Sequence, residues 1–240
     1  MDVYENVVIG GFIYALGYSA GKRAFSLPAN INLLQQTPMD KSLADVLIGM
    51  PDVYYLLEFK RRANKGDKEA QKLAFLQRYL SQDDPRFLEV SRGTHLYIES
   101  ELSGEDLETR CSSYLDFQSQ LKPVRLERIV EFLLEGTLIR ERGISGDECC
   151  HYLGLVQQAY KAVDGVEGVS GNSGGFIIVG GTMSGTLKFV TLPDIRQFTM
   201  TRERLEKLQH EQTLQRENAM SRTRSRSRGI ERGRGQSRGF

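Results

Sequence analysis

The sequence predicts an α/β protein, and three observations lead to that prediction. Two short runs, residues 46–50 and 53–59, are rich in apolar, β-branched and aromatic side chains and are separated by Pro51 and Asp52, the pattern of a β-hairpin. Residues 5–20 and 64–81 carry apolar side chains at helical spacing on either side of it. Apolar residues make up 40% of the 240 residues, which is sufficient for a real core.

The order of the remaining elements extends this reading. Residues 33–36 are expected to form a short strand before the hairpin, and residues 94–100 a strand after the second helix. The first hundred residues are therefore predicted to run helix, three strands, helix, strand.

The turn of the hairpin sets the strand register. Proline cannot take the positive φ that two-residue hairpin turns need, so a four-residue loop over 50–53, with Pro51 at the second position of a type I turn, is expected. Gly49 then pairs with Tyr54, and paired positions sum to 103.

That register brings two carboxylates and a lysine together. Asp45 falls opposite Glu58 at a Cα separation of roughly 5 Å. Lys60 lies on the same face as Glu58, about 6 to 7 Å further along the strand. Asp52 falls in the turn, roughly 20 Å from Glu58, and cannot share an ion with it.

Asp45, Glu58, Phe59 and Lys60 resemble the motif of the PD-(D/E)XK nuclease superfamily, with Ala44 where that motif has proline. The resemblance covers about residues 1–100 and implies a restriction-endonuclease-like αβββαβ core. It further implies that Asp45 and Glu58 hold Mg²⁺ or Mn²⁺ and that Lys60 orients the attacking water in phosphodiester hydrolysis. The expected substrate is DNA, with RNA as the alternative. Some members carry a helix-borne acid beside the metal, a role that would fall to Glu5.

Two other interpretations stay open. In the first, Glu58 and Lys60 are a surface pair and Asp45 merely starts a strand; burial of both acids would argue against it, because unpaired buried carboxylates are costly. In the second, the chain is a non-catalytic nucleic-acid-binding or assembly protein, with or without a degenerate nuclease fold.

Basic residues on and before the second helix are candidates for contact with a phosphate backbone. The alternative is an ordinary solvated helix face. The residues are Arg61, Arg62, Lys65, Lys68 and Lys72.

Residues 103–198 are predicted to form a mostly helical extension, and two roles stay open for its helices: docking on the core or binding a partner. Helices are expected over 126–142 and 145–163, the second opened by a capping box of Ser145 and Glu148. Residues 176–179 and 187–192 are predicted to form a second hairpin after the Gly/Ser-rich stretch 165–175. A phosphate-binding loop is the alternative for these glycines, but no Gly-Lys-Ser/Thr follows them.

The C-terminal residues differ from the rest of the chain. Residues 199–220 are predicted to form a helix that is partly exposed or pairs with a protein partner. Residues 221–240 contain seven arginines and one glutamate, a net charge of +6 against +1 for the whole chain, and are expected to be disordered. Such a tail would contact nucleic-acid phosphates without reading sequence. Its arginines are Arg222, Arg224, Arg226, Arg228, Arg232, Arg234 and Arg238.

The cysteines and the apolar N-terminal segment bear on location. Cys111, Cys149 and Cys150 are too few and too close for a disulfide framework, which favours a reducing compartment such as the cytoplasm. Cys149, Cys150 and His151 are too close together for a tetrahedral zinc site. The apolar segment 7–20 is shorter than the roughly 20 residues that span a bilayer, so a membrane is not an expected partner.

Overall fold

A computed structural model of the chain describes residues 4–23, 30–34, 44–50, 53–64, 67–104, 106–136, 141–164, 176–181, 187–192 and 214. The chain divides into two compact units, Met1–Thr199 and Met200–Phe240. All described residues except Leu214 belong to the first unit, so the core and the predicted extension lie in one unit.

The first unit is built on one mixed sheet of eight strands, in the order β6-β5-β4-β3-β2-β1-β7-β8. β3 and β4 run parallel and every other neighbouring pair is antiparallel. The strands are β1 Asn30–Leu33, β2 Val46–Met50, β3 Val53–Arg61, β4 His95–Ser103, β5 Asp106–Ser113, β6 Lys122–Pro123, β7 Phe176–Gly181 and β8 Leu187–Leu192.

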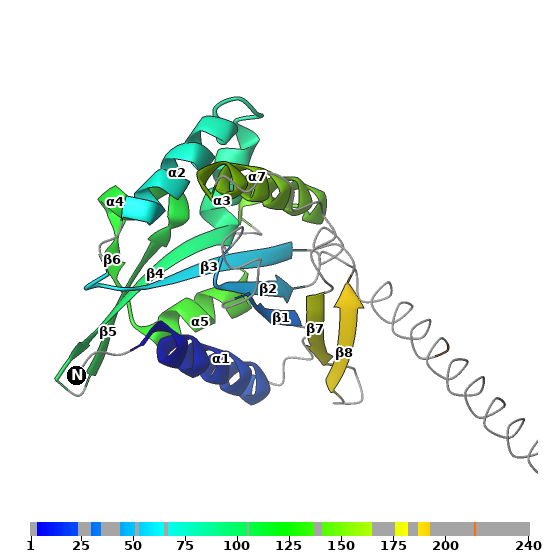
Figure 1. Cartoon of the computed structure of the whole chain (residues 1–240). Helices are drawn as coiled ribbons and strands as arrows, with labels where there is room; N and C mark the ends of the chain where they lie inside the picture. The colour runs from blue at the N-terminus through cyan, green and yellow to red at the C-terminus, as the bar shows by residue number, and fades with distance from the viewer. Residues whose placement is uncertain are drawn as a thin grey trace, which may run out of the picture. The chain divides into compact units, whose positions relative to one another are not determined.

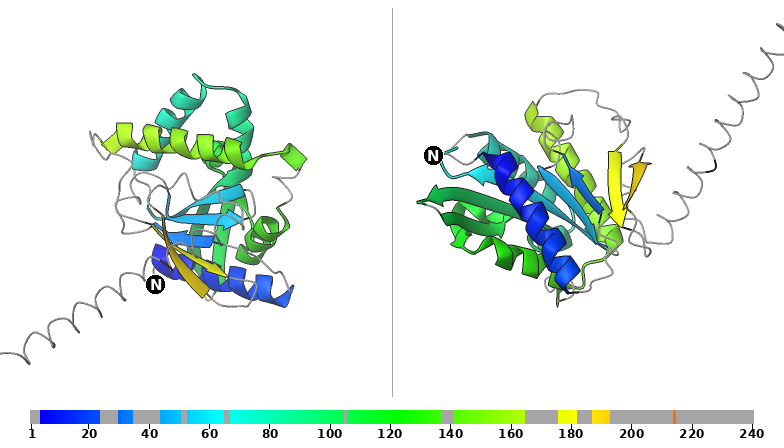
Figure 2. Two further views of the ribbon diagram at one scale, coloured as in Figure 1. Left: turned by 90° about the vertical axis from the view of Figure 1, so that its right-hand side faces the viewer. Right: turned by 90° about the horizontal axis from the view of Figure 1, so that it is seen from below.

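Helices cover both faces of this sheet, so the predicted α/β class is confirmed. α1 and α5 pack together on one face, and α2, α3 and α7 lie on the other (Figures 1 and 2). α2 and α3 form the crossover that two adjacent parallel strands require. The helices are α1 Glu5–Lys22, α2 Asp67–Leu80, α3 Arg86–Thr94, the 3₁₀ helix η1 Tyr114–Asp116, α4 Phe117–Gln120, α5 Leu126–Glu135 and α7 Gly146–Asp164.

The central strand β3 is buried along most of its length. Residues 53–59 are all buried, as expected for a strand covered on both faces. On the α1 side, Phe59 meets Phe12 edge to face with 5.4 Å between ring centroids. Side chains alternate along a strand, so Glu58 and Lys60 point to the opposite face, which α2 and α7 cover.

Several element boundaries differ from the sequence prediction. β1 ends at Leu33, where the strand was expected to begin, because its register is set by pairing with β2 and β7. α5 ends at Glu135 and not at 142, because Gly136 takes a left-handed φ of 58° and caps the helix.

The region after residue 103 contributes to the sheet as well as to the helices. β5 was not predicted; it returns from β4 through Gly104, which has a φ of 67°, and pairs along all of β4 from Leu96. The second hairpin, β7 and β8, formed as predicted and extends the same sheet beside β1. The extension is therefore less helical than expected.

Leu214 is helical, and the rest of the predicted helix over 199–220 and the tail over 221–240 lie outside the described residues. Among the helices that the structure describes, none is long and apolar enough to cross a membrane.

Candidate active site

The predicted hairpin register is confirmed. Val46 pairs with Leu57, Gly49 with Tyr54 and Met50 with Val53, so paired positions sum to 103 as expected. Pro51 and Asp52, between the two strands, lie outside the described residues.

β2 and β3 separate where the candidate residues begin. Pairing stops at Val46 and Leu57, although β3 continues to Arg61 beside β4. The backbone N–H groups of β3 beyond this point have lost their strand partner and bind carboxylates: Phe59 donates to Asp45 Oδ2 at 2.7 Å, and Arg61 donates to Glu5 Oε1 at 3.2 Å. The divergence of two strands thus gathers acids at one place.

Glu58 and Lys60 meet as predicted and Asp45 binds the next residue, Phe59, but the expected strand pair of Asp45 with Glu58 lies beyond the β2–β3 ladder, which ends at Val46 and Leu57. Lys60 Nζ lies 2.7 Å from Glu58 Oε1, and the charge of Asp45 also acts on Lys60. Asp45 and Glu58 are 3% and 2% exposed. This burial argues against the reading of Glu58 and Lys60 as a surface pair.

Helix α2 adds two charged residues that the sequence analysis did not assign to the site. Lys72 Nζ lies 3.2 Å from Glu69 Oε1 and 3.8 Å from Glu58 Oε1, and Lys60 Nζ lies 3.9 Å from Glu69 Oε1. The site is therefore a cluster of three carboxylates and two ammonium groups, here called the charge cluster: Asp45, Glu58, Lys60, Glu69 and Lys72.

Aromatic side chains from η1, α7 and β4 lie next to the charge cluster. The Tyr114 hydroxyl donates to Glu69 Oε2 at 2.9 Å. Lys72 Nζ lies 4.8 Å from the centroid of the Tyr160 ring, in the geometry of a cation–π contact. His95 stacks on Tyr114 with 4.2 Å between centroids, and its Nδ1 lies 2.9 Å from the Tyr152 hydroxyl.

The pKa directions follow from burial and from the paired charges. Burial would raise the pKa of Glu58, but Lys72 and Lys60 outweigh it and the pKa of this carboxyl is lowered. Burial would lower the pKa of Lys60, yet the charges of Glu58, Asp45 and Glu69 outweigh burial and raise it. Burial would also lower the pKa of Lys72, and the charges of Glu58 and Glu69 raise it. Glu58 and both lysines are accordingly charged at neutral pH.

The pKa values of Glu69 and His95 shift in the direction that favours the neutral form of each side chain. Burial and the charge of Glu58 raise the pKa of Glu69. Burial lowers the pKa of His95 to about 3, so this ring is neutral at physiological pH. The positive charge of the cluster therefore comes from lysine alone.

One acceptor in the cluster is unsatisfied. Glu58 Oε2 is buried and has no hydrogen-bond partner, an arrangement that normally costs free energy. Within the cluster the side chains of Lys60 and Glu69 are 18% and 13% exposed, whereas the Lys72 side chain is 5% exposed.

The residues present fit a divalent cation in donor type. Carboxylate oxygens are the ligands that Mg²⁺ and Mn²⁺ prefer, and Glu58 Oε2 offers a lone pair without a donor. Within the described ranges, no group of three or more His, Cys, Asp or Glu side chains is placed to hold a metal. Asp45 and Glu58 are thus a two-acid set, and Glu5 is engaged with the Arg61 and Asn64 nitrogens.

The basic residues expected to share one face on and before the second helix have different surroundings in the structure. Lys72, assigned to it, is buried in the charge cluster, and the Arg62 guanidinium pairs with Glu101 at 2.5 Å. The Arg61 guanidinium lies over the Tyr4 ring, 5.6 Å from its centroid. Lys68 is exposed, and Lys65 lies outside the described residues.

The cysteines are not gathered with other metal ligands in the described part of the chain. Cys111, Cys149 and Cys150 are not joined in a disulfide, and His151 stacks on Phe87 and binds Asp83 with 3.0 Å between Nε2 and Oδ2. The stretch over 165–175 and the arginines Arg222, Arg224, Arg226, Arg228, Arg232, Arg234 and Arg238 lie outside the described residues.

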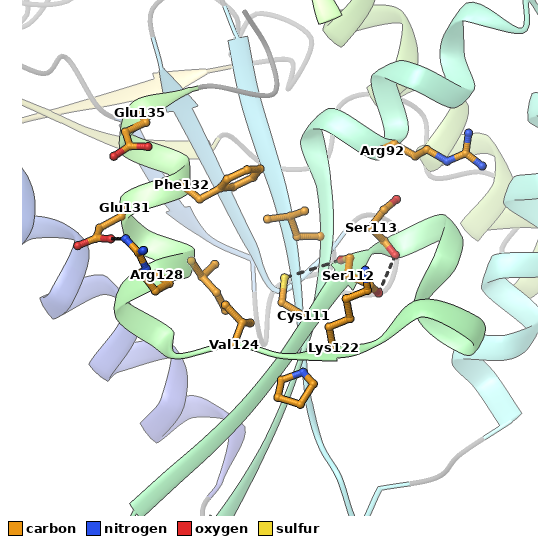
Figure 3. A pocket seen from close by; sticks show the side chains of 13 residues that line it. Arg92, Cys111, Ser112, Ser113, Lys122, Val124, Arg128, Glu131, Phe132 and Glu135 are labelled. Atoms are coloured by element: carbon orange, nitrogen blue, oxygen red, sulfur yellow. Dashed lines mark hydrogen bonds and ion pairs between the residues drawn. The ribbon is translucent and has the colours of Figure 1, made fainter. Parts of the chain in front are cut away.

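A cavity of about 610 Å³ lies elsewhere, between β5, β6 and α5 (Figure 3). Cys111, Val124 and Phe132 are on its wall, and Arg92 and Lys122 are among its polar residues. No member of the charge cluster lines it. Its volume suits a small molecule, but the acids of the candidate active site are not part of it.

No protein-family model, curated protein or solved structure matches this chain. The charge cluster is therefore the feature from which a function can be inferred.

Proposed function

We propose that this chain is a metal-dependent nuclease in which Asp45, Glu58 and Lys60 form the active site. The observation that carries the proposal is the burial of Asp45 and Glu58, with Lys60 paired to Glu58, at the point where β2 and β3 diverge. Two acids and a lysine in this arrangement are suited to phosphodiester hydrolysis.

The fold supports the same proposal. The chain runs through a helix, three antiparallel strands, a helical crossover and a strand parallel to the third. This is the αβββαβ order that the resemblance to the PD-(D/E)XK superfamily implies. Asp45 precedes the second strand, and Glu58 and Lys60 lie in the third.

The five residues of the charge cluster would have different roles in this reaction. Asp45 and Glu58 would hold Mg²⁺ or Mn²⁺, and Glu58 Oε2 is buried without a hydrogen-bond donor. When bound, the ion polarises the phosphate and acidifies a water. Lys60 positions the nucleophile and steadies developing negative charge, and Glu69 and Lys72 hold Lys60 and Glu58 in place.

The test is cleavage of supercoiled plasmid, linear duplex, single-stranded DNA and RNA with Mg²⁺ or Mn²⁺. We expect cutting that EDTA abolishes and that Lys60→Ala or Glu58→Ala reduces by 10²-fold or more, on the order of one lost electrostatic contact at the transition state. Lys68→Ala, on the exposed part of α2, is the control. Undiminished cutting by Lys60→Ala overturns the assignment.

A specific observation favours one alternative, a non-catalytic nucleic-acid-binding or assembly protein with the same fold. Glu58 is already neutralised by two lysines and is nearly excluded from solvent. Binding of Mn²⁺ separates the two functions: the nuclease requires Mn²⁺ affinity that Asp45→Asn removes, whereas the scaffold requires none.

A further inference from the structure

The outer face of α1 carries a pattern that packing within this chain does not explain. Its inner face, with Val8, Ile9, Phe12 and Leu16, is buried against the sheet and α5. Its outer face has residues at helical spacing with no charge among them, and Figure 2 shows α1 at the outside of the first unit. This outer face consists of Val7, Gly10, Gly11, Tyr14, Gly17, Tyr18 and Gly21.

The apolar side chains of the outer face are unusually exposed. Tyr14 is 75%, Tyr18 60% and Val7 61% exposed, and the two tyrosine rings stack on each other with 6.3 Å between centroids. A contiguous exposed apolar face of this kind marks an interaction site more often than a single exposed residue does.

The four glycines of the outer face are not required by packing against the described residues. A Cβ at Gly10, Gly11, Gly17 or Gly21 would meet nothing within 4 Å, so no close approach inside the molecule requires glycine there. Glycine within a helix is destabilising relative to alanine. Their common position on one face therefore points to a surface outside the chain that approaches the helix backbone.

The order of bulky and small residues on the outer face is self-complementary. Two α1 helices packed antiparallel about a twofold axis at Tyr14 place Tyr18 opposite Gly10 and Val7 opposite Gly21 of the other copy. Gly11 then faces Gly17, and the two Tyr14 side chains meet at the axis. Such matching of one patch with itself is what a twofold interface requires.

We propose that the outer face of α1 is a homodimer interface, with the second occupant another copy of this chain. The face offers on the order of 500 Å² per molecule, or about 1,000 Å² for the pair, which is near the lower bound for a specific interface. The dimer is accordingly reversible. The absence of charge on the face disfavours nucleic acid, which would require basic groups.

Sedimentation velocity of the full chain over a concentration series tests the interface, in about 0.5 M salt so that contacts made by charged segments are screened. We expect the sedimentation coefficient of the wild type to rise from monomer to dimer. Tyr14→Glu, which brings two carboxylates together at the axis, and Gly10→Leu, which fills the space for Tyr18, should stay monomeric. Gln77→Glu on exposed α2 is the control and should behave as wild type.

Cysteine cross-linking gives an independent readout of the axis. Tyr14→Cys should form a disulfide-linked dimer on mild oxidation, whereas Ser19→Cys, on another side of α1, should form no more than the wild type does. A wild type that is monomeric at every concentration overturns the proposal, as does a dimer that survives both Tyr14→Glu and Gly10→Leu. A monomer that cosediments with phosphatidylcholine vesicles would assign the face to a lipid surface and also overturns it.

Discussion

The residues of the charge cluster depend on one another because they are buried together. Lys72, which is 4% exposed, forms ion pairs with two carboxylates, those of Glu58 and Glu69. Removing one partner of such a group leaves an uncompensated charge away from water. Substitutions in the charge cluster are therefore expected to change the stability of the fold as well as any catalytic activity.

Replacing Lys72 with methionine tests this dependence. We expect Lys72→Met to lower the free energy of unfolding by about 3 kcal/mol at neutral pH, the scale for breaking a buried ion pair. Urea denaturation measures the loss, and Lys68→Met, one turn earlier on the exposed surface, should change it by less than about 1 kcal/mol. Equal effects of the two substitutions would contradict the buried network.

The lowered pKa of Glu58 predicts a pH dependence of stability. A carboxyl whose pKa is lower in the folded state than its ordinary 4.5 stabilises the fold above that value, and this contribution is lost as pH falls through the folded pKa. The difference in unfolding free energy between the wild type and Glu58→Gln should therefore be larger at pH 7 than at pH 3. Urea titrations at several pH values measure it, with Glu108→Gln on the exposed part of β5 as control.

A difference between wild type and Glu58→Gln that does not change with pH would show that the carboxyl is not held ionised by the lysines.

At the scale of elements, some structure could be predicted from the sequence because local chemistry fixes it. Pro51 excluded the two-residue turns that need positive φ and so set the register, and the alternation along β3 put Lys60 on the same face as Glu58. The capping box also follows from two residues, and it formed: Glu148 accepts the Ser145 N–H at 2.7 Å, and Ser145 Oγ accepts the Glu148 N–H at 3.3 Å.

Other elements could not be predicted because tertiary contacts decide them. β5 lacks the apolar alternation of a strand and forms because β4 offers it a complete edge. Lys72 was expected on the polar face of its helix and Glu69 was not singled out, because the sequence of α2 does not fix which side of the helix faces β3. The resemblance to a nuclease motif thus predicted the strand residues of the site and missed those from the helix.

The capping box of α7 gives a prediction for that element. Ser145→Ala should lower the free energy of unfolding by about 1 kcal/mol, the usual value for an N-cap. Glu148→Ala should cost more, because Glu148 also accepts a hydrogen bond from Arg86 at 2.6 Å and binds the Ser145 amide. Thermal and urea unfolding of the two variants measure the order, and the reverse order would contradict it.

Two glycines provide a matched pair for helix energetics. Gly10→Ala should stabilise the monomer by about 0.5–1 kcal/mol, because the helix gains propensity and the new methyl meets nothing. Gly136→Ala should destabilise by a similar amount, because Gly136 has a φ of 58°. Urea unfolding at low protein concentration measures both, and the same sign for both would contradict the assigned conformations.

For the whole molecule, the arginine tail and the charge cluster are expected to act separately. A chain ending at Met220 loses a net charge of +6, so its affinity for nucleic acid should fall and the slope of log affinity against log salt should flatten by up to about five. Fluorescence anisotropy at several salt concentrations measures this. Lys60→Ala should leave that slope nearly unchanged. If Lys60→Ala flattened the slope as much as the truncation does, the tail and the charge cluster would not act separately.

The place of β1 in the sheet has a consequence for synthesis of the chain. β1 is completed on one edge by β2, soon after it, and on the other by β7, through the pairs of Asn30 with Gly180 and Ile31 with Val179. A ribosome must therefore make about 145 further residues before that second edge can be covered. Throughout this interval the nascent chain presents open N–H and C=O groups to other chains, which makes it a target for aggregation and for chaperones.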